Sequence, residues 1–237
     1  EFKNVSFKFE DSKQPTINNV SFKIPAGQKV ALLGKMGSGK STISKLIAGM
    51  IEPTSGAILI DGIDVRQIDT ADIRKNIGIM LQDSWLFSGT IRENIQMGYN
   101  EYDDQHVLQI CKVAGVDDFV GSHPKGYDLE IKERGIGLSG GQKQTINLAR
   151  SLLHNPKILL LDEPTSSMDQ GTEQKVIQSL REFCEDKSMF VVTHRNPILA
   201  MVDRVLVMDS LTGQIKVTGS YGGGSSGGSS IFIQTGS

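Results

Sequence analysis

Residues 34–42, Gly34-Lys35-Met36-Gly37-Ser38-Gly39-Lys40-Ser41-Thr42, match the pattern G-x-x-x-x-G-K-[ST]. The apolar segment before this loop, residues 28–33, predicts a strand, and residues 43–50 after it predict a helix. Glycines let the backbone turn so that successive N–H groups point at phosphate oxygens, and the following helix adds its positive end. Lys40 can reach β- and γ-phosphates, and the Ser41 hydroxyl suits Mg²⁺. The whole stretch is therefore predicted to bind a nucleotide.

The composition is that of a globular domain. The chain has 237 residues, of which 38% are hydrophobic and 22% charged, which excludes a disordered or fibrous chain. Lys and Arg number 25 against 27 Asp and Glu, a formal net charge of −2. This balance argues against nucleic acid as a partner, because such binders usually carry a basic excess. Cys111 and Cys184 show neither metal spacing nor a disulfide framework, which indicates a reducing compartment.

The ends of the chain point to an excised domain. No apolar run approaches the roughly 18 residues of a membrane span, and the first residue is Glu1 rather than Met. We therefore expect a soluble fragment of a longer polypeptide. Residues 205–208 and 214–218 predict a final hairpin, so the domain is placed at 1–218. Residues 219–237 are Gly/Ser-rich and are interpreted as a flexible linker and tail of engineered origin.

A second buried strand, residues 158–161, ends in two carboxylates, Asp162 and Glu163. Its apolar run does not alternate with polar residues, and neither does the run at residues 190–193. Such runs are typical of strands buried on both faces of a parallel sheet. Ligands gather at the carboxyl ends of such strands, where the phosphate loop also lies. Asp162 is predicted to hold Mg²⁺ through water. Glu163 is predicted to polarise the attacking water as the general base.

The middle of the chain, about residues 90–150, differs from the rest because its spacing is helical. Near its end stands Leu138-Ser139-Gly140-Gly141-Gln142, in which a serine and glycines open a helix and form a second anion-binding terminus. One chain cannot readily close both termini on one nucleotide. A head-to-tail pair of chains can do so, each offering its second terminus to the other's ATP.

Together these motifs resemble the ATP-binding cassette (ABC) family over about residues 1–218. Leu138–Gln142 is similar to its signature motif, which acts in trans on the partner's nucleotide. The resemblance implies an α/β P-loop NTPase fold: a RecA-like, mainly parallel sheet core, an antiparallel β subdomain and an inserted α-helical subdomain carrying the signature. It also implies ATP and Mg²⁺ as cofactors, ATP hydrolysis, and a homodimer that closes around two ATP molecules.

Further positions match the family one by one. Gln82 looks like the Q-loop glutamine, which senses Mg²⁺ and faces the membrane domain. Ser166 and Asp169 stand in a segment similar to the D-loop at the dimer interface, and His194 looks like the switch histidine at the γ-phosphate. Phe9 stands where the family places an aromatic, usually tyrosine, that stacks on adenine. The implied catalytic residues are Glu163, His194 and Gln82, and the implied metal-binding residues are Ser41, Gln82 and Asp162.

Short segments beside the Q-loop and the signature resemble the exporter subclass, namely residues 87–95 and 133–135. Residues 123–128 and 164–169 are similar to type I secretion ATPases of the LapB kind. The implied partners are a transmembrane domain of the same polypeptide, a periplasmic adaptor and an outer-membrane channel. The implied location is the cytoplasmic face of the inner membrane, and the implied function is ATP-driven export, with type I protein secretion as the main prediction.

Other functions stay open at this point. One is a different ABC exporter of small molecules, lipids or peptides, and another is a non-transport ABC ATPase of the DNA-repair or chromosome type. The latter class carries a long coiled coil between the two motifs, whereas Lys40 and Ser139 are only 99 positions apart. A regulatory module without hydrolysis would not need Glu163 and His194. Arg150 and Arg195 are interpreted as solvated side chains.

Overall fold

The computed structural model describes residues 1–82, 85–99 and 101–220. The predicted Gly/Ser-rich tail lies outside the described residues from 221 onward. The last strand, β12, runs from Ile215 to Ser220, so regular structure continues two residues past the predicted domain end at 218.

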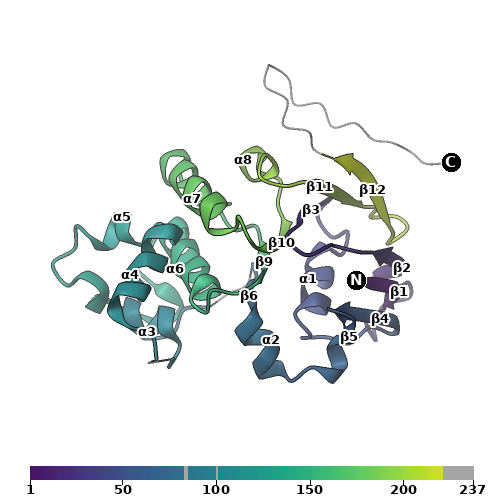
Figure 1. The fold of residues 1–237 in the computed structure, drawn as a ribbon, viewed down its shortest axis with the longest axis horizontal. Helices are drawn as coiled ribbons and strands as arrows, with labels where there is room; N and C mark the ends of the chain where they lie inside the picture. The colour runs from purple at the N-terminus through teal and green to yellow at the C-terminus, as the bar shows by residue number, and fades with distance from the viewer. Residues whose placement is uncertain (83–84, 100, 221–237) are drawn as a thin grey trace, which may run out of the picture.

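A six-stranded sheet forms the middle of the molecule (Figure 1). Its strand order is β12-β11-β3-β10-β9-β6; β12 is antiparallel to β11, and all other neighbours are parallel. The strands other than β12 are β3 (Lys29–Gly34), β6 (Ile77–Met80), β9 (Ile158–Asp162), β10 (Ser188–Val192) and β11 (Arg204–Met208). The sheet is thus mainly parallel, as the sequence predicts.

Strand β6 is the one strand of this sheet that the sequence analysis does not predict. It has four residues, and one of them is Gly78, which weakens the strand pattern. The structure explains the glycine, because a Cβ at this position would run into the carbonyl oxygen of Ser151 on the helix packed against the strand.

The strands at the centre of this sheet are buried on both faces, as predicted. In β9, Leu159 and Leu161 belong to a core shared with α7 (Gln170–Phe183) and α8 (Asn196–Leu199). Leu160 points to a second core, shared with α1 (Lys40–Ile47). All three leucines are 0% exposed, so each face of the strand removes apolar surface from water.

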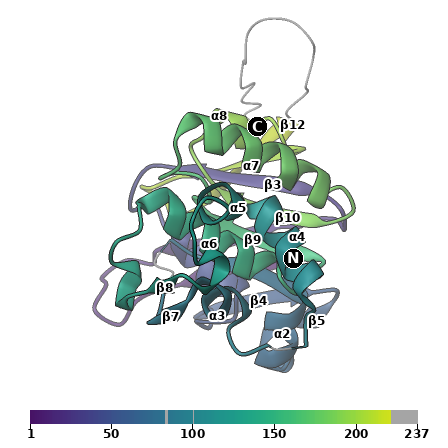
Figure 2. The ribbon, with the colours of Figure 1, turned by 90° about the vertical axis from the view of Figure 1, so that its left-hand side faces the viewer.

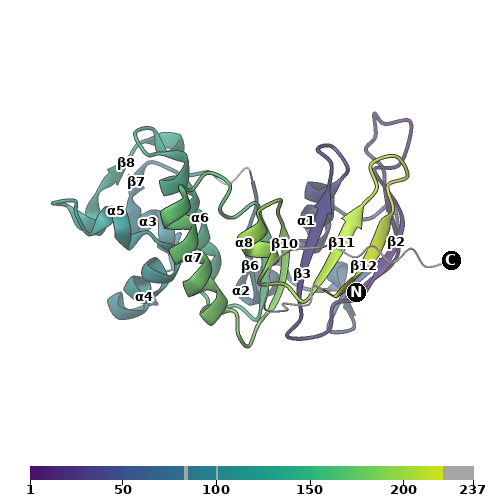
Figure 3. The same cartoon turned by 90° about the horizontal axis from the view of Figure 1, so that it is seen from above.

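A four-stranded antiparallel sheet covers the second core; in Figure 3 its strand β2 lies at the right, at the opposite end of the molecule from the helices at the left. Its order is β2-β1-β4-β5, from β1 (Phe2–Phe7), β2 (Ile17–Phe22), β4 (Ser55–Ile60) and β5 (Ile63–Asp64). The ring of Phe22 stacks on Phe2 at a centroid distance of 4.5 Å and lies 6.2 Å from Phe190 of the central sheet. These aromatic contacts join the two sheets.

Helices occupy the segment for which the sequence predicts them, and Figure 2 views the molecule from their side. They are α3 (Ile91–Gln96), α4 (Asp104–Ala114), α5 (Asp117–Val120) and α6 (Gly140–Leu152); α2 (Thr70–Asn76) precedes them, and a short ladder of β7 (Gly89–Thr90) and β8 (Glu130–Ile131) accompanies them. Helix α4 shows why they form: Asp103 caps its N-terminus, Gly115 ends it in the left-handed conformation, and its buried residues recur at helical spacing.

Arg150 of α6 is not the solvated side chain that the sequence analysis expects. Its guanidinium donates hydrogen bonds to the carbonyl oxygen of Trp85 (2.6 Å), to Asn94 Oδ1 (2.7 Å) and to the Asn94 carbonyl oxygen. Burial lowers its pKa to about 10. Asn94 is fully buried and also bonds both backbone groups of Phe87 at 3.0 Å. Arg150 thereby ties α6 to α3 and to the segment that follows Gln82.

Candidate nucleotide site

The register of the central sheet brings four chain segments to one edge. Val192 pairs with Asp162 on one side and with Leu32 on the other, while Met80 pairs with Leu161. The segments that follow β3, β6, β9 and β10 therefore leave the sheet together. They carry the phosphate loop, Gln82, Glu163 and His194, in that order.

The phosphate loop wraps tightly between β3 and α1. Gly37 and Gly39 have φ angles of +74° and +101°, which a residue with a side chain rarely adopts. A Cβ on Gly39 would also lie 3.0 Å from Ile17 Cδ1 and 3.2 Å from the Thr16 carbonyl oxygen. The loop therefore requires glycine here both for its backbone conformation and for its close approach to the segment leading into β2.

Lys40 curls back over this loop. Its Nζ donates to the carbonyl oxygens of Gly34 (2.7 Å) and Lys35 (2.9 Å). Burial lowers the pKa of Lys40, and the carboxylates of Glu163 and Asp162 act in the opposite direction. The ammonium group is thus held against the loop backbone, within the electrostatic influence of two acidic side chains.

The loop has the features expected of an anion cradle. Ser38 is 3% exposed, and its Oγ is buried without a hydrogen-bond partner among the described residues. A Cβ on Gly34 would lie 2.6 Å from this hydroxyl, so glycine leaves the space that the serine needs. A buried hydroxyl without a partner costs about 1–3 kcal/mol. A phosphate oxygen in the loop is the kind of acceptor that would remove this cost.

A cleft of about 470 Å³ opens over the loop. It is lined by residues from the loop, from both carboxylate positions and from the predicted glutamine, histidine and phenylalanine. These are Phe9, Thr16, Met36, Gly37, Gly39, Lys40, Ser41, Thr42, Gln82, Asp162, Glu163, Val192 and His194. The structure therefore brings together most of the predicted site residues; Thr16 and Val192 are additions, because neither residue type marks a binding position in the sequence.

Glu163 has an unusual backbone at the end of β9. Its φ angle is +49°, in the left-handed region, and its N–H donates to the Val192 carbonyl oxygen at 2.8 Å. A non-glycine residue holds this conformation only where its surroundings fix it, and such residues concentrate at functional sites. Its Oε1 lies 3.9 Å from His194 Nε2. The Glu163 side chain is 18% exposed and that of His194 57%, so both can meet a ligand in the cleft.

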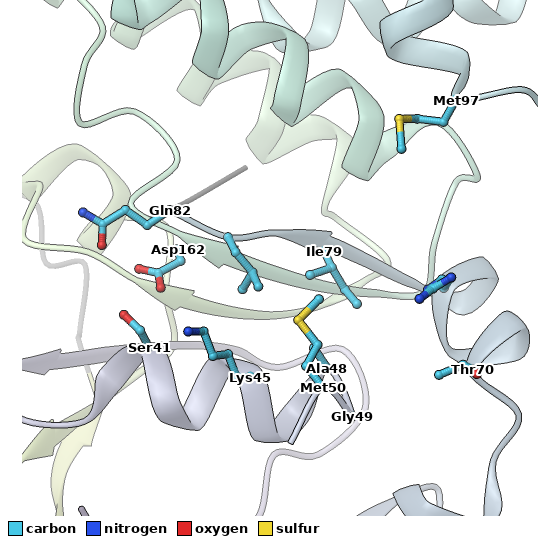
Figure 4. Close-up of a pocket in the computed structure, with 12 residues that line it drawn as sticks. Ser41, Lys45, Ala48, Gly49, Met50, Thr70, Ile79, Gln82, Met97 and Asp162 are labelled. Carbon is cyan, nitrogen blue, oxygen red and sulfur yellow. The ribbon is translucent and has the colours of Figure 1, made fainter. Parts of the chain in front are cut away.

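Oxygen donors for a cation lie together beside Glu163. Figure 4 shows the side chains of Ser41, Gln82 and Asp162 gathered at one end of a pocket, from α1, the segment after β6 and the end of β9. Asp162 is 2% exposed and Ser41 and Gln82 are exposed. A hydroxyl, an amide oxygen and a carboxylate are ligands that suit Mg²⁺.

Phe9 lies at the rim of the cleft, two residues beyond the end of β1. Its ring is 49% exposed and contacts Phe7 edge-on at a centroid distance of 4.8 Å. An exposed aromatic face held by a second ring can stack on a flat base. Adenine stacking therefore stays a prediction that this geometry permits.

Replacing Phe9 by Ala is expected to weaken ATP binding about tenfold, because base stacking on an aromatic side chain contributes about 1–3 kcal/mol. Calorimetric titration with ATP measures the change. Phe9→Tyr, which keeps the ring, should bind like the wild type, and the affinity for inorganic triphosphate, which has no base, should not change in either variant. An unaltered ATP affinity in Phe9→Ala would show that Phe9 does not contact the base.

The signature residues lie away from this cleft. Ser139 caps α6: its Oγ accepts from the Gln142 N–H (3.1 Å), and Gln142 Oε1 accepts from the Ser139 N–H (2.9 Å). Gly140 and Gly141 form the first helical positions. None of residues 138–142 is among the described residues that line the cleft. The structure thus has a second helix N-terminus that its own nucleotide cleft does not use.

Ser166 and Asp169 lie between β9 and α7. The Asp169 carboxylate caps α7 by accepting from the N–H groups of Gly171 and Thr172, each at 3.0 Å, and from Thr172 Oγ1 at 2.7 Å. These bonds lower the pKa of Asp169, and the bond from the Thr172 hydroxyl contributes most. Within the chain, Asp169 thus has a capping role beside the predicted interface role.

Arg195, like Arg150, is not the solvated side chain that the sequence indicates. Its Nη2 donates to the Ser166 carbonyl oxygen at 2.7 Å, and its Nη1 lies 3.4 Å from Glu173 Oε2. Glu173 is 4% exposed and also accepts from Thr165 Oγ1 at 2.7 Å. Arg195 follows His194 directly, so it links the histidine segment to the loop that contains Ser166.

A groove of about 520 Å³ opens beside the nucleotide cleft (Figure 4). Ser41, Gln82 and Asp162 line both spaces, so the two meet at the predicted metal ligands. The remaining lining comes from α1 and the residues just after it, from α2, from β6 and the residue after it, and from the end of α3: Lys45, Ala48, Gly49, Met50, Thr70, Arg74, Ile79, Leu81 and Met97. Met50 and Met97 are 56% and 52% exposed, which gives the groove an apolar rim.

Comparison with known proteins identifies the class. Residues 17–166 match the family model described as ABC transporter. The chain therefore belongs to the ABC transporter family, and its fold is the ABC ATPase P-loop fold with its antiparallel sheet and inserted helices. It is an ATPase domain of the kind found in ABC exporters.

Individual relatives support this assignment. A Bacillus subtilis protein named "Putative multidrug export ATP-binding/permease protein YgaD" is 42% identical over 212 residues, 90% of this chain and 37% of YgaD. SAB1799c of Staphylococcus aureus, with a name of the same kind, is 39% identical over 218 residues, 92% of this chain and 37% of that protein. A solved structure of a bacterial Atm1-family ABC exporter with ATP bound matches with a TM-score of 0.84 and 39% identity, over 90% of this chain and 37% of that chain.

These relatives support only the coarser part of the predicted subclass. They support an exporter, but they do not support type I protein secretion, and the alternative of a small-molecule exporter fits their names better. The chain spans 37% of the length of each of these relatives. Within the part of the chain that the structure describes, no helix combines the length and the apolar character that crossing a membrane requires.

Proposed function

We propose that this chain binds ATP with Mg²⁺ in the 470 Å³ cleft, hydrolyses it in a head-to-tail dimer, and so powers export through a membrane domain. The observation that carries the proposal is the meeting of five functional groups at one edge of the sheet. These are the phosphate loop, Gln82, Asp162, Glu163 and His194.

Nucleotide binding uses the loop and the start of α1. The backbone N–H groups of the loop and Ser38 Oγ donate to phosphate oxygens, and Lys40 exchanges its contacts with the carbonyl oxygens of Gly34 and Lys35 for the β- and γ-phosphates. Phe9 covers the base. Ser41, Gln82 and Asp162 would hold Mg²⁺, which would neutralise charge on the phosphate oxygens when bound.

Hydrolysis uses the two side chains at the far side of the cleft. The Glu163 carboxylate accepts a proton from a water molecule while the water oxygen attacks the γ-phosphorus. The bond from this phosphorus to the β–γ bridging oxygen breaks, and ADP leaves with its electron pair. His194, whose ring nitrogen lies 3.9 Å from Glu163, donates to a γ-phosphate oxygen and stabilises the charge that develops there.

The dimer follows from the position of the signature residues. Leu138–Gln142 form an exposed or half-exposed helix start that does not line the chain's own cleft. In a head-to-tail pair, Ser139 and Gly141 of each chain would reach the partner's γ-phosphate. This arrangement supplies the anion-binding groups that one cleft lacks on its open side. Ser166 and Asp169 would lie along the same interface.

The groove beside the cleft is the proposed contact with the membrane domain of the parent polypeptide. Its rim is apolar at Met50 and Met97, and its floor ends at Gln82, one of the proposed metal ligands. A segment of the membrane domain bound there would lie next to Gln82, so nucleotide binding at the cleft could alter its contacts. The transporter would thus hold this domain at the cytoplasmic face of the plasma membrane. The adaptor and outer-membrane channel of the type I interpretation are left out of this assembly.

Small molecules are the proposed cargo, because the relatives that cover this chain almost completely are named for multidrug export. Inverted membrane vesicles that contain the full-length polypeptide test this point with a lipophilic cationic dye as probe. ATP is expected to drive dye into wild-type vesicles, and the Glu163→Gln variant is expected to give no uptake. Wild-type vesicles that hydrolyse ATP without moving the dye would contradict this cargo class and leave the ATPase assignment intact.

A further inference from the structure

Gln144 of α6 makes contacts that neither the phosphate loop nor the signature residues explain. Its Nε2 donates to the Glu163 carbonyl oxygen at 3.0 Å and to Ser166 Oγ at 2.8 Å. Its Oε1 accepts from the Ser167 N–H at 2.8 Å. Both ends of the amide are therefore hydrogen-bonded. Only this orientation lets Nε2 donate to a carbonyl oxygen while Oε1 accepts from an N–H group.

These bonds hold the backbone that aims the Glu163 carboxylate. Glu163 lies in the left-handed region, so its two peptide groups must be fixed by their neighbours. Val192 binds its N–H, while Gln144, the Ser166 hydroxyl (3.2 Å) and the Ser166 N–H (3.3 Å) all converge on its carbonyl oxygen. Of the three residues named here, only Gln144 belongs to the helix that the signature opens.

The N-terminus of α6 is also packed closely on the same loop. A Cβ on Gly140 would lie 3.1 Å from Ser167 Cβ, and one on Gly141 would lie 3.0 Å from the Ser167 carbonyl oxygen. Gln144 follows Ser139 by five residues, about 7.5 Å along the helix axis at 1.5 Å per residue. The start of the helix and the turn at Glu163 are therefore joined by this packing and by one amide.

We infer that Gln144 is a positioning residue that couples the two ATP sites of the dimer. The inference rests on the proposed function, in which the signature of one chain contacts the ATP bound by its partner. Engagement of Ser139 on the partner's nucleotide fixes α6, Gln144 then fixes the Glu163 turn, and the chain's own site becomes competent for hydrolysis. Hydrolysis at each site thus depends on occupancy of the other.

Gln144→Met tests the inference, because methionine keeps the length of the side chain and the helix propensity but makes none of the three hydrogen bonds. We expect kcat for ATP hydrolysis by the full chain to fall about tenfold or more, since small misplacements of reacting groups cost that much. The Kd for ATP should change less than about twofold, and the Hill coefficient for ATP should fall to about 1. Gln144→Glu, which puts an acceptor against the Glu163 carbonyl oxygen, should lower kcat at least as far.

Gln178→Met is the matched control: the same exchange at an exposed position of α7, expected to leave all three quantities unchanged. Thermal unfolding of each variant checks that it is folded. We expect Gln144→Met to lose kcat while its melting temperature stays like that of the wild type. An unchanged kcat and Hill coefficient in Gln144→Met, or a wild-type Hill coefficient of 1, would overturn the coupling role alone. A wild-type chain that binds ATP and hydrolyses none would instead overturn the proposed function.

Discussion

Glu163→Gln is expected to bind ATP as the wild type does and to hydrolyse it at least about 100-fold more slowly, because a general base contributes about 10²–10⁴ in rate. The amide has nearly the same shape as the carboxylate, so the turn at the end of β9 is retained, but it cannot take the proton from water. Phosphate release at saturating Mg-ATP measures the rate, and titration with a fluorescent ATP analogue measures the affinity.

Glu182→Gln is the control for this exchange, since Glu182 is exposed on α7 and away from the cleft. Its rate and affinity should equal those of the wild type. If Glu163→Gln released phosphate at the wild-type rate, Glu163 could not be the base, and the left-handed turn would have another purpose.

Lys40→Ala is expected to weaken ATP binding about 100-fold, because two charge-assisted hydrogen bonds to phosphate, at about 1.5 kcal/mol each, are lost. In the structure, Lys40 Nζ is already held at the mouth of the loop by two carbonyl oxygens. Alanine leaves the helix intact, so the loss concerns affinity rather than folding. Calorimetric titration with Mg-ATP gives the ratio of the two Kd values.

Lys75→Ala serves as the matched exchange, because Lys75 is an exposed residue at the end of α2 that does not line the cleft. Its Kd should stay within about twofold of the wild type. A Lys40→Ala variant that bound Mg-ATP as tightly as Lys75→Ala would remove the lysine from the phosphate contacts.

Local patterns were sufficient to predict the core of the site. The phosphate loop needs glycines at fixed places because its backbone has positive φ angles, and β9 needs an uninterrupted apolar run because both faces are buried. Each of these requirements concerns residues that are adjacent in the sequence, so it can be recognised in one short stretch. The register of the parallel sheet then placed the predicted residues at one edge.

Contacts between distant residues left no such signal. Gln144 and the Glu163 carbonyl oxygen are 19 positions apart, Arg195 and Glu173 are 22 apart, and Arg150 and Asn94 are 56 apart. A glutamine or arginine on a helix has the same local pattern whether it meets water or a buried carbonyl group. The sequence therefore does not distinguish these buried contacts from a solvated side chain.

The type I secretion subclass, which the comparisons do not support, rested on similarly weak local patterns. It relied in part on residues 123–128, a surface stretch in which Tyr127 donates a hydrogen bond to Asp117 Oδ1 at 2.9 Å. Packing within the helical segment is enough to explain a tyrosine there, so the stretch says little about cargo. The relatives, matched over 90% or more of this chain, are themselves named for multidrug export.

The two composite sites of a head-to-tail dimer are tested most directly by light scattering during size-exclusion chromatography of Glu163→Gln. Without nucleotide the variant should have the mass of one chain, 25.8 kDa. With saturating Mg-ATP it should have twice that mass, because the signature of each chain closes on ATP that is not hydrolysed. A mass of 25.8 kDa in the presence of bound ATP would contradict the composite sites.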